Sequence, residues 1–184
     1  MLAIEVQDIF INRDIAIWCG CFAAFLPIAC ASAIAGEGQA DPLAMLTPLA
    51  QSTQPIDVGS TALEIAHAVN PAVQVSASSM RLNALTKELM PAVSAATDPR
   101  AKLEVMGEYI YKQWGFADRS ALPADVFVSF ADVLAKKQWN CFGISVLYIA
   151  LGERIGLPFE LISGRGHVCL QLKATNLYVE TTDG

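Results

Sequence analysis

The pattern of apolar and polar positions is clearest in residues 141–155, where most side chains are apolar. Asn140 directly before this run is a favoured helix N-cap, and Gly156 after it suits the left-handed residue that ends many helices. A helix that is apolar on most sides belongs in the centre of a domain. We therefore predict a buried central helix that begins at Cys141.

Three short runs typical of strands follow this helix. They cover residues 159–163, 167–173 and 177–181, and the second alternates apolar and polar positions. Glycines at the first connection and polar residues at the second, 174–176, indicate turns. We expect a small antiparallel sheet against the central helix.

Helical patterns also precede the central helix. We expect a short helix over 61–69 and an amphipathic helix that Asp98 caps and that ends near Gly115. A further helix is predicted over 124–137, with apolar positions facing inward. Those inward positions are Val126, Phe127, Phe130, Val133 and Leu134. Helices followed by strands indicate the α+β class, with N-terminal helices and a central Cys-bearing helix packed on the sheet.

The first 35 residues differ from the rest of the chain. Residues 15–35 form an almost uninterrupted apolar run after Arg13, and small residues near its end resemble cleavage sites. We interpret 1–35 as a signal peptide, or as an uncleaved membrane anchor formed by 15–35. Residues 36–60 read as a linker, and 61–184 as the folded domain with its core in 125–184. The chain is therefore expected to be exported, and either periplasmic, secreted or anchored in the membrane.

Composition excludes some function classes. The 184 residues carry a formal net charge of −6, and no basic stripe is present, so we expect no nucleic-acid partner. The chain has only 2 histidines, and His67 has no second ligand nearby in sequence, so we expect no metal and no cofactor.

The candidate chemistry lies in the last third of the chain. A thiol attacks as thiolate, and Cys141 at the first turn of a helix would face backbone N–H groups that favour the anion. His167 at the start of a strand could act as general base. An acid would then orient the imidazole, and Glu180 and Asp183 are the two candidates.

Local pattern leaves the choice of acid open. With a loop of 174–176, residue 167 pairs with Asp183; with a loop of 175–176, Glu180 shares the face of His167. Cys169 is also on the face of His167, since it lies two residues further along the strand. Cys141 and Cys169 could instead form a disulfide in an exported protein.

Several motifs occur together in the order of a known family. They are WNCFG at 139–143, LGERIGLP at 151–158, GHV at 166–168 and YVE at 178–180. In combination they resemble the transglutaminase-like superfamily, particularly its bacterial SirB-type branch. The resemblance implies a papain-like core in which Cys141 is the nucleophile, His167 the base and Glu180 the third member of the triad. The chain stops directly after the acid motif, where the family continues, so we expect a C-terminally truncated fragment.

Two functions are in competition. The first is a cysteine-dependent acyl-transfer enzyme that hydrolyses an amide, or transfers its acyl group to an amine, through a thioester on Cys141. Its substrate would be a peptide, a protein or a cell-envelope amide. The alternative is a catalytically inactive exported binding or scaffold module of the same fold.

Overall fold

The computed structural model describes residues 51, 55–116, 122–123 and 128–182. The predicted leader, residues 36–50 and 52–54 of the predicted linker, Val126, Phe127 and Asp183 lie outside these residues. No helix within the described ranges is long and apolar enough to cross a membrane.

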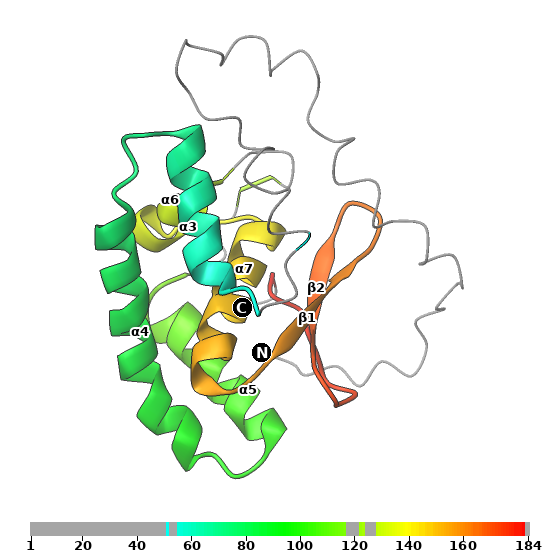
Figure 1. Ribbon diagram of the computed structural model, residues 1–184. Helices are drawn as coiled ribbons and strands as arrows, with labels where there is room; N and C mark the ends of the chain where they lie inside the picture. Colours follow the sequence, from blue (N-terminus) through cyan, green and yellow to red (C-terminus); the bar gives the residue numbers. More distant parts are fainter. Residues whose placement is uncertain (1–50, 52–54, 117–121, 124–127, 183–184) are drawn as a thin grey trace.

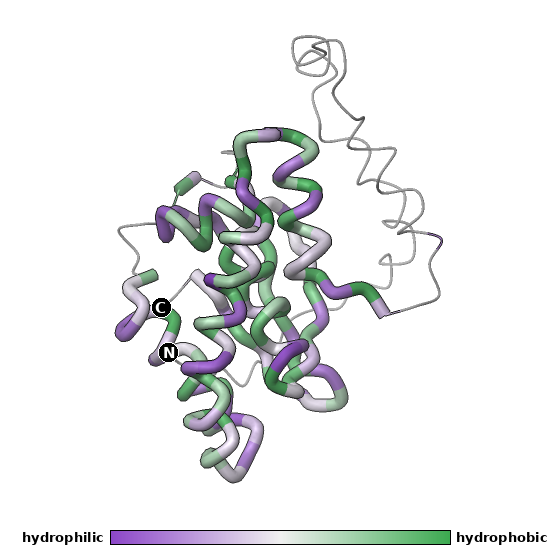
Figure 2. Tube along the Cα trace, turned by 60° about the vertical axis from the view of Figure 1, so that its left-hand side comes forward, coloured by the Kyte–Doolittle hydropathy of each residue, from purple (hydrophilic) through white to green (hydrophobic). Residues whose placement is uncertain are grey.

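The described chain is an α+β domain, as predicted. Figure 1 shows helix α7 between a layer of helices and a hairpin of two strands, and Figure 2 shows apolar and polar stretches alternating along the helices. The helices are α3 (Val58–Val69), α4 (Val75–Ala95), α5 (Pro99–Gly107), the π-helix η2 (Glu108–Gln113), α6 (Phe130–Lys136) and α7 (Cys141–Ile155). The strands are β1 (Phe159–Ser163), β2 (Val168–Leu172) and β3 (Tyr178–Val179).

Helix α7 has the bounds that the sequence predicts. The Asn140 side chain accepts a hydrogen bond of 2.8 Å from the Gly143 backbone N–H, and Gly156 ends the helix with a φ of 76°. Gly152 allows the closest packing of α7 on the sheet, because a Cβ there would lie 2.6 Å from the Phe159 ring. Local capping signals thus fix both ends of the central helix.

Helix α3 begins earlier than predicted, at Val58 and not at residue 61. Its N-cap, Asp57, accepts a hydrogen bond from the Ser60 backbone N–H and also pairs with Arg154 of α7. The cap itself is local, because Asp57 and Ser60 are three residues apart, and the pair with Arg154 joins the start of α3 to α7.

The longest helix, α4, lies where the sequence patterns above predict no element. Its buried positions recur at helical spacing, but they are separated by Ser, Ala and charged residues, and Pro91 stands inside the helix. The buried residues are Leu82, Leu85, Thr86, Leu89 and Val93. Packing against α3, α6 and α7 stabilises α4 despite its weak amphipathic pattern.

Two other helix predictions are confirmed in part. The helix capped by Asp98 continues from α5 into η2, where the Trp114 backbone N–H donates to the Tyr109 carbonyl at 2.7 Å, a π-helical bond. Helix α6 begins at Phe130 with Ser129 as its N-cap, and residues 124–127 of the predicted helix lie outside the described residues. Phe130, Val133 and Leu134 are buried, as expected.

The sheet has the order β1-β2-β3, and both pairs are antiparallel. In the second pair, Leu170 lies opposite Val179 and Gln171 opposite Tyr178. The connecting turn therefore spans four residues, 173–176, so both predicted loop lengths are wrong. Ala174 in this turn has a φ of 59°, a conformation that the sequence gives no reason to expect.

Candidate functional site

Cys141 is the first residue of α7, where the backbone N–H groups of the first turn have no partner within the helix. Its side chain is partly exposed and forms no disulfide. Asn140 beside it is buried, and so is Trp139, which is 1% exposed and packs edge-to-face on Tyr111. Buried neighbours therefore anchor the start of α7 while Cys141 remains accessible.

His167 and Glu180 form a close pair. The distance from His167 Nε2 to Glu180 Oε2 is 2.7 Å, and the two side chains are 45% and 27% exposed. A carboxylate oxygen can only accept, so Nε2 carries the proton of the neutral ring, and Nδ1 has the free lone pair. The nitrogen that remains to act as a base is Nδ1.

The Glu180 carboxylate is held at both oxygens. Its Oε1 accepts hydrogen bonds from the backbone N–H and the hydroxyl of Thr182, at 3.0 and 2.6 Å. Burial alone would raise the pKa of Glu180, but the hydrogen bonds from Thr182 and His167 outweigh it and lower the pKa below its usual range. Glu180 is thus an oriented carboxylate at neutral pH.

The direction of the chain places this pair at the Cys141 end of the domain. β1 runs back along α7, and β2 runs antiparallel to β1, so β2 starts at the end of the sheet beside the start of α7 (Figure 1). Within the described part of the chain, the His167 ring makes no hydrogen bond to Cys141 Sγ.

A second contact brings the segment of Glu180 close to Cys141. Ser145 lies one helical turn after Cys141, so the two share a face of α7, with Cβ atoms about 5–6 Å apart. The Ser145 hydroxyl lies 3.1 Å from the hydroxyl of Thr181, the residue after Glu180. The acid-bearing segment therefore passes the first turns of α7. Asp183, the other predicted acid, is outside the described residues.

Cys169 lies opposite Glu180 if the register of β2 and β3 is continued by one residue. Burial raises the pKa of the Cys169 thiol, and the negative charge of Glu180 raises it further. Both cysteines are free, so the predicted alternative of a disulfide is wrong for this structure. Cys169 is thus a neutral neighbour of the His167–Glu180 pair.

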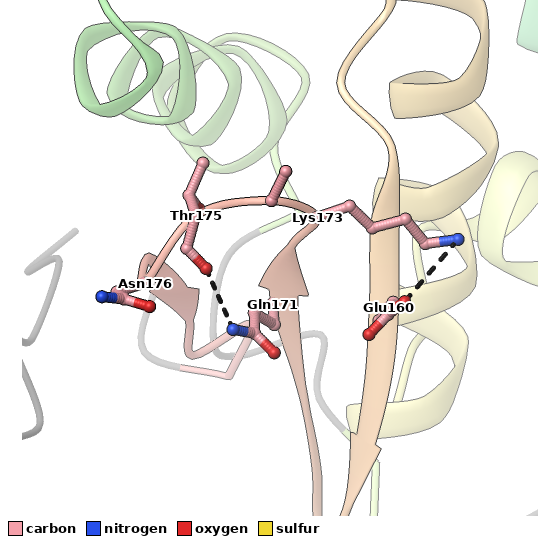
Figure 3. A pocket seen from close by; sticks show the side chains of 6 residues that line it. Glu160, Gln171, Lys173, Thr175 and Asn176 are labelled. Atoms are coloured by element: carbon pink, nitrogen blue, oxygen red, sulfur yellow. Dashed lines mark hydrogen bonds and ion pairs between the residues drawn. The ribbon is translucent and has the colours of Figure 1, made fainter.

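The hollow that Figure 3 shows belongs to the opposite end of the sheet. It has a volume of about 380 Å³ and lies around the turn after β2. Gln171 donates to the Thr175 carbonyl there, and Lys173 lies 3.9 Å from Glu160. None of the predicted site residues lines it.

His67 is not part of a metal-binding group among the described residues. Its Nδ1 lies 3.0 Å from the Val73 carbonyl, and among the described residues no group of histidines, cysteines and acids could hold a metal ion. Sequence reasoning missed Ser145, Thr181 and Thr182, since a hydroxyl residue in a local pattern does not reveal what it will bond across the fold.

Comparisons with known proteins agree with this architecture. A family model of the transglutaminase-like superfamily matches residues 76–184. The chain belongs to the transglutaminase-like superfamily. It is also 29% identical over 103 residues to a UPF0162 protein of Vibrio cholerae serotype O1, a stretch that covers 55% of this chain and 38% of the relative. The chain thus spans well under half of that relative's length. No solved structure matches the chain significantly.

Proposed function

We propose that this member of the superfamily is a cysteine-dependent acyl-transfer enzyme with Cys141, His167 and Glu180 as its triad. The observation that carries the proposal is the 2.7 Å pair of His167 and Glu180 at the end of the sheet beside the start of α7. The pair leaves Nδ1 of His167 available as a base, and Cys141 heads the helix at that end.

The chemistry follows the triad logic. His167 Nδ1 takes the proton of the Cys141 thiol, and the thiolate attacks the carbonyl carbon of an amide. Backbone N–H groups at the start of α7, including that of Cys141, face the developing oxyanion. The tetrahedral intermediate expels the amine, which takes the proton from His167, and leaves a thioester on Cys141. Water or a second amine then releases the acyl group by the same route.

Glu180 has an orienting role in this scheme. It fixes the tautomer of His167 and stabilises the imidazolium that forms when the thiol loses its proton. Catalytic hydrogen bonds are often long in a ligand-free enzyme and shorten with substrate, so the missing bond between Cys141 and His167 fits a resting site.

The substrate class is an amide of a peptide, a protein or the cell envelope. This rests on the proposed export of the chain through its apolar N-terminal run. Cys169 is a poor nucleophile at neutral pH, because its pKa is raised and the thiolate is the attacking form. Cys141 is therefore the reacting thiol in this proposal.

The test is the iodoacetamide alkylation rate of Cys141 against pH, on the full 184-residue chain. Mass spectrometry of peptides resolves Cys141 from the other 4 cysteines. An ordinary thiol, with a pKa of about 8.5, reacts ever more slowly below pH 8. We expect fast alkylation of Cys141 to persist to pH 6, and His167→Ala to slow it there by about 30-fold.

His67→Ala is the matched control, since it removes the other histidine, which is exposed on α3. Equal rates in both histidine variants, or an ordinary thiol titration in the parent protein, would overturn the enzyme proposal. The inactive binding module would then be the better description.

A further inference from the structure

Next to the proposed triad lies a cluster of buried hydroxyl groups that the proposed chemistry does not use. Ser145 and Thr181 are both fully buried, with 0% exposure, and their hydroxyl oxygens lie 3.1 Å apart. Burying polar groups costs free energy unless they are hydrogen-bonded, so apolar side chains would be the simpler filling of this space. The presence of these two buried hydroxyl groups beside the proposed triad therefore suggests that they have a specific role.

Tyr111 makes a further contact with Thr181, through the Thr181 backbone. Its hydroxyl donates a short hydrogen bond to the Thr181 carbonyl, 70 residues away in sequence. Tyr111 lies on η2, the π-helical segment, and it packs against Tyr148 of α7 with a distance of 6.3 Å between ring centroids. Burial raises the pKa of Tyr148 well above its usual range, and Tyr111 raises it further. Near neutral pH, Tyr148 is therefore a neutral hydroxyl.

Thr181 is thus bound through both its backbone and its side chain. Its two neighbours are the residues of the acid motif: Glu180 pairs with His167, and Thr182 donates twice to Glu180. The segment 180–182 is consequently fixed to η2 and α7 through Thr181, and to His167 through Glu180.

Strand pairing cannot supply this fixation. β3 comprises only Tyr178 and Val179, and its ladder with β2 ends at the pair of Val179 and Leu170. Glu180 therefore lies beyond the regular sheet, where a strand end is free to fray. Directional bonds to buried hydroxyls fix a segment in one place, which apolar contacts do less well.

We propose that Thr181, held by Tyr111 and Ser145, is the positioning residue that sets Glu180, and through it the ring of His167, relative to Cys141. The catalytic role of this placement of Glu180 and His167 rests on the proposed function. The placement itself can be measured without any activity.

The first measurement is the tautomer of each histidine, from nitrogen-15 spectra of the full chain at pH 8. His167 should hold its proton on Nε2, facing Glu180, whereas His67 should hold it on Nδ1, facing the Val73 carbonyl. The two histidines therefore give opposite signatures, and His67 serves as an internal reference.

Thr181→Val removes the hydroxyl and keeps the shape. We expect it to replace the single tautomer of His167 by exchange between both forms and to leave His67 unchanged, and we expect the same result for Glu180→Gln. Thr181→Ser keeps a hydroxyl and should restore the parent spectrum. Thr86→Val is the matched control, because Thr86 is also buried and its hydroxyl bonds only to the Leu82 carbonyl of its own helix. A fixed Nε2–H tautomer in Thr181→Val would overturn the positioning role.

If Thr181→Val does not fold, Ser145→Ala removes the same bond from the opposite side, and Tyr111→Phe removes the bond to the Thr181 carbonyl. Either variant should then free the His167 tautomer, and a fixed tautomer in both would overturn the proposal.

Alkylation of Cys141 at pH 6 separates the two proposals. We expect Thr181→Val to slow it by about fivefold, less than His167→Ala, because the base is still present. If His167→Ala slows alkylation and the Thr181, Ser145 and Tyr111 variants do not, the positioning role fails and the function stands. If the tautomer is freed while alkylation never depends on His167, the function fails and the placement of Glu180 by Thr181 stands.

Discussion

The two ends of α7 are tied to the rest of the fold in different ways. At its C-terminal end, Arg154 pairs with Asp57 at 2.8 Å, and the Glu153 carboxylate accepts a hydrogen bond from the Val58 backbone N–H. These contacts lie near the surface, since the Asp57 side chain is 51% exposed. At its N-terminal end, the buried hydroxyls of Ser145 and Thr181 lie next to a partly exposed pair, His167 and Glu180.

The difference teaches what each end is suited to do. Arginine stays charged at every physiological pH, so its pair with Asp57 can only hold α3 against α7. His167 bonds to Glu180 through Nε2 only, and its Nδ1 has no protein partner among the described residues. One end joins two helices, and the other places an imidazole beside a carboxylate.

The largest effect should come from displacing α7 as a whole. In Gly152→Ala, the new Cβ would collide with the Leu157 carbonyl and lie 2.6 Å from the Phe159 ring, so the helix must move off the sheet and disturb both ends. We expect a loss of about 3 kcal/mol in the free energy of unfolding, measured with urea and tryptophan fluorescence. Gly164→Ala is the control, because the nearest atom to its Cβ would be the His167 carbonyl oxygen at 3.8 Å. Equal stability of the two variants would contradict this packing.

Removing the N-cap should weaken the N-terminal end alone. Asn140→Ala leaves the Gly143 N–H without its partner in a buried place, and we expect a loss of about 1–2 kcal/mol in the same urea experiment. Asn140→Asp keeps an acceptor and should recover most of that loss. If alanine were as stable as aspartate, capping would not hold the start of α7.

The C-terminal end should respond less, and in a salt-dependent way. Arg154→Gln removes the charge that faces Asp57, and the expected loss is about 0.5–1 kcal/mol at low ionic strength. In 1 M salt most of this difference should vanish, because exposed pairs are screened. The Asn140→Ala loss should persist in salt, since its hydrogen bond is neutral and buried. Similar salt dependence in both variants would remove the contrast between the two ends.

The smallest expected effect is a change in acid sensitivity. The folded-state pKa of Glu180 is lowered from an ordinary value of 4.5, so its stabilising contribution is complete above about pH 5 and is lost as the pH falls through the lowered value. Unfolding free energies from pH 6 to pH 3 should therefore fall less steeply in Glu180→Gln than in the parent. Glu160→Gln, on the exposed surface of β1, is the matched control and should follow the parent curve. A Glu180→Gln curve parallel to the parent would show that the carboxylate gains no stabilisation from Thr182 and His167.

The sequence by itself determined the elements that carry their own start and stop signals. Asn140 and Gly156 bound α7 because capping is a local interaction, and β1 has the predicted bounds of 159–163. The positions of Cys141 at the start of α7 and of His167 directly before β2 follow from the same signals. The motifs that join them were specific enough in combination to indicate the superfamily to which the chain belongs.

Tertiary structure decided everything that depends on a partner distant in the sequence. Helix α4 is stabilised by packing against α3, α5, α6 and α7, and the Asp57 cap of α3 pairs with the distant Arg154. The four-residue turn after β2 set the register of β2 and β3, and a change of one residue would have turned the end of β3, and Glu180 after it, to the other face. Tyr111, Ser145 and Thr181 meet only in the folded core, since hydrogen bonds across 36 and 70 residues leave no trace in a local pattern.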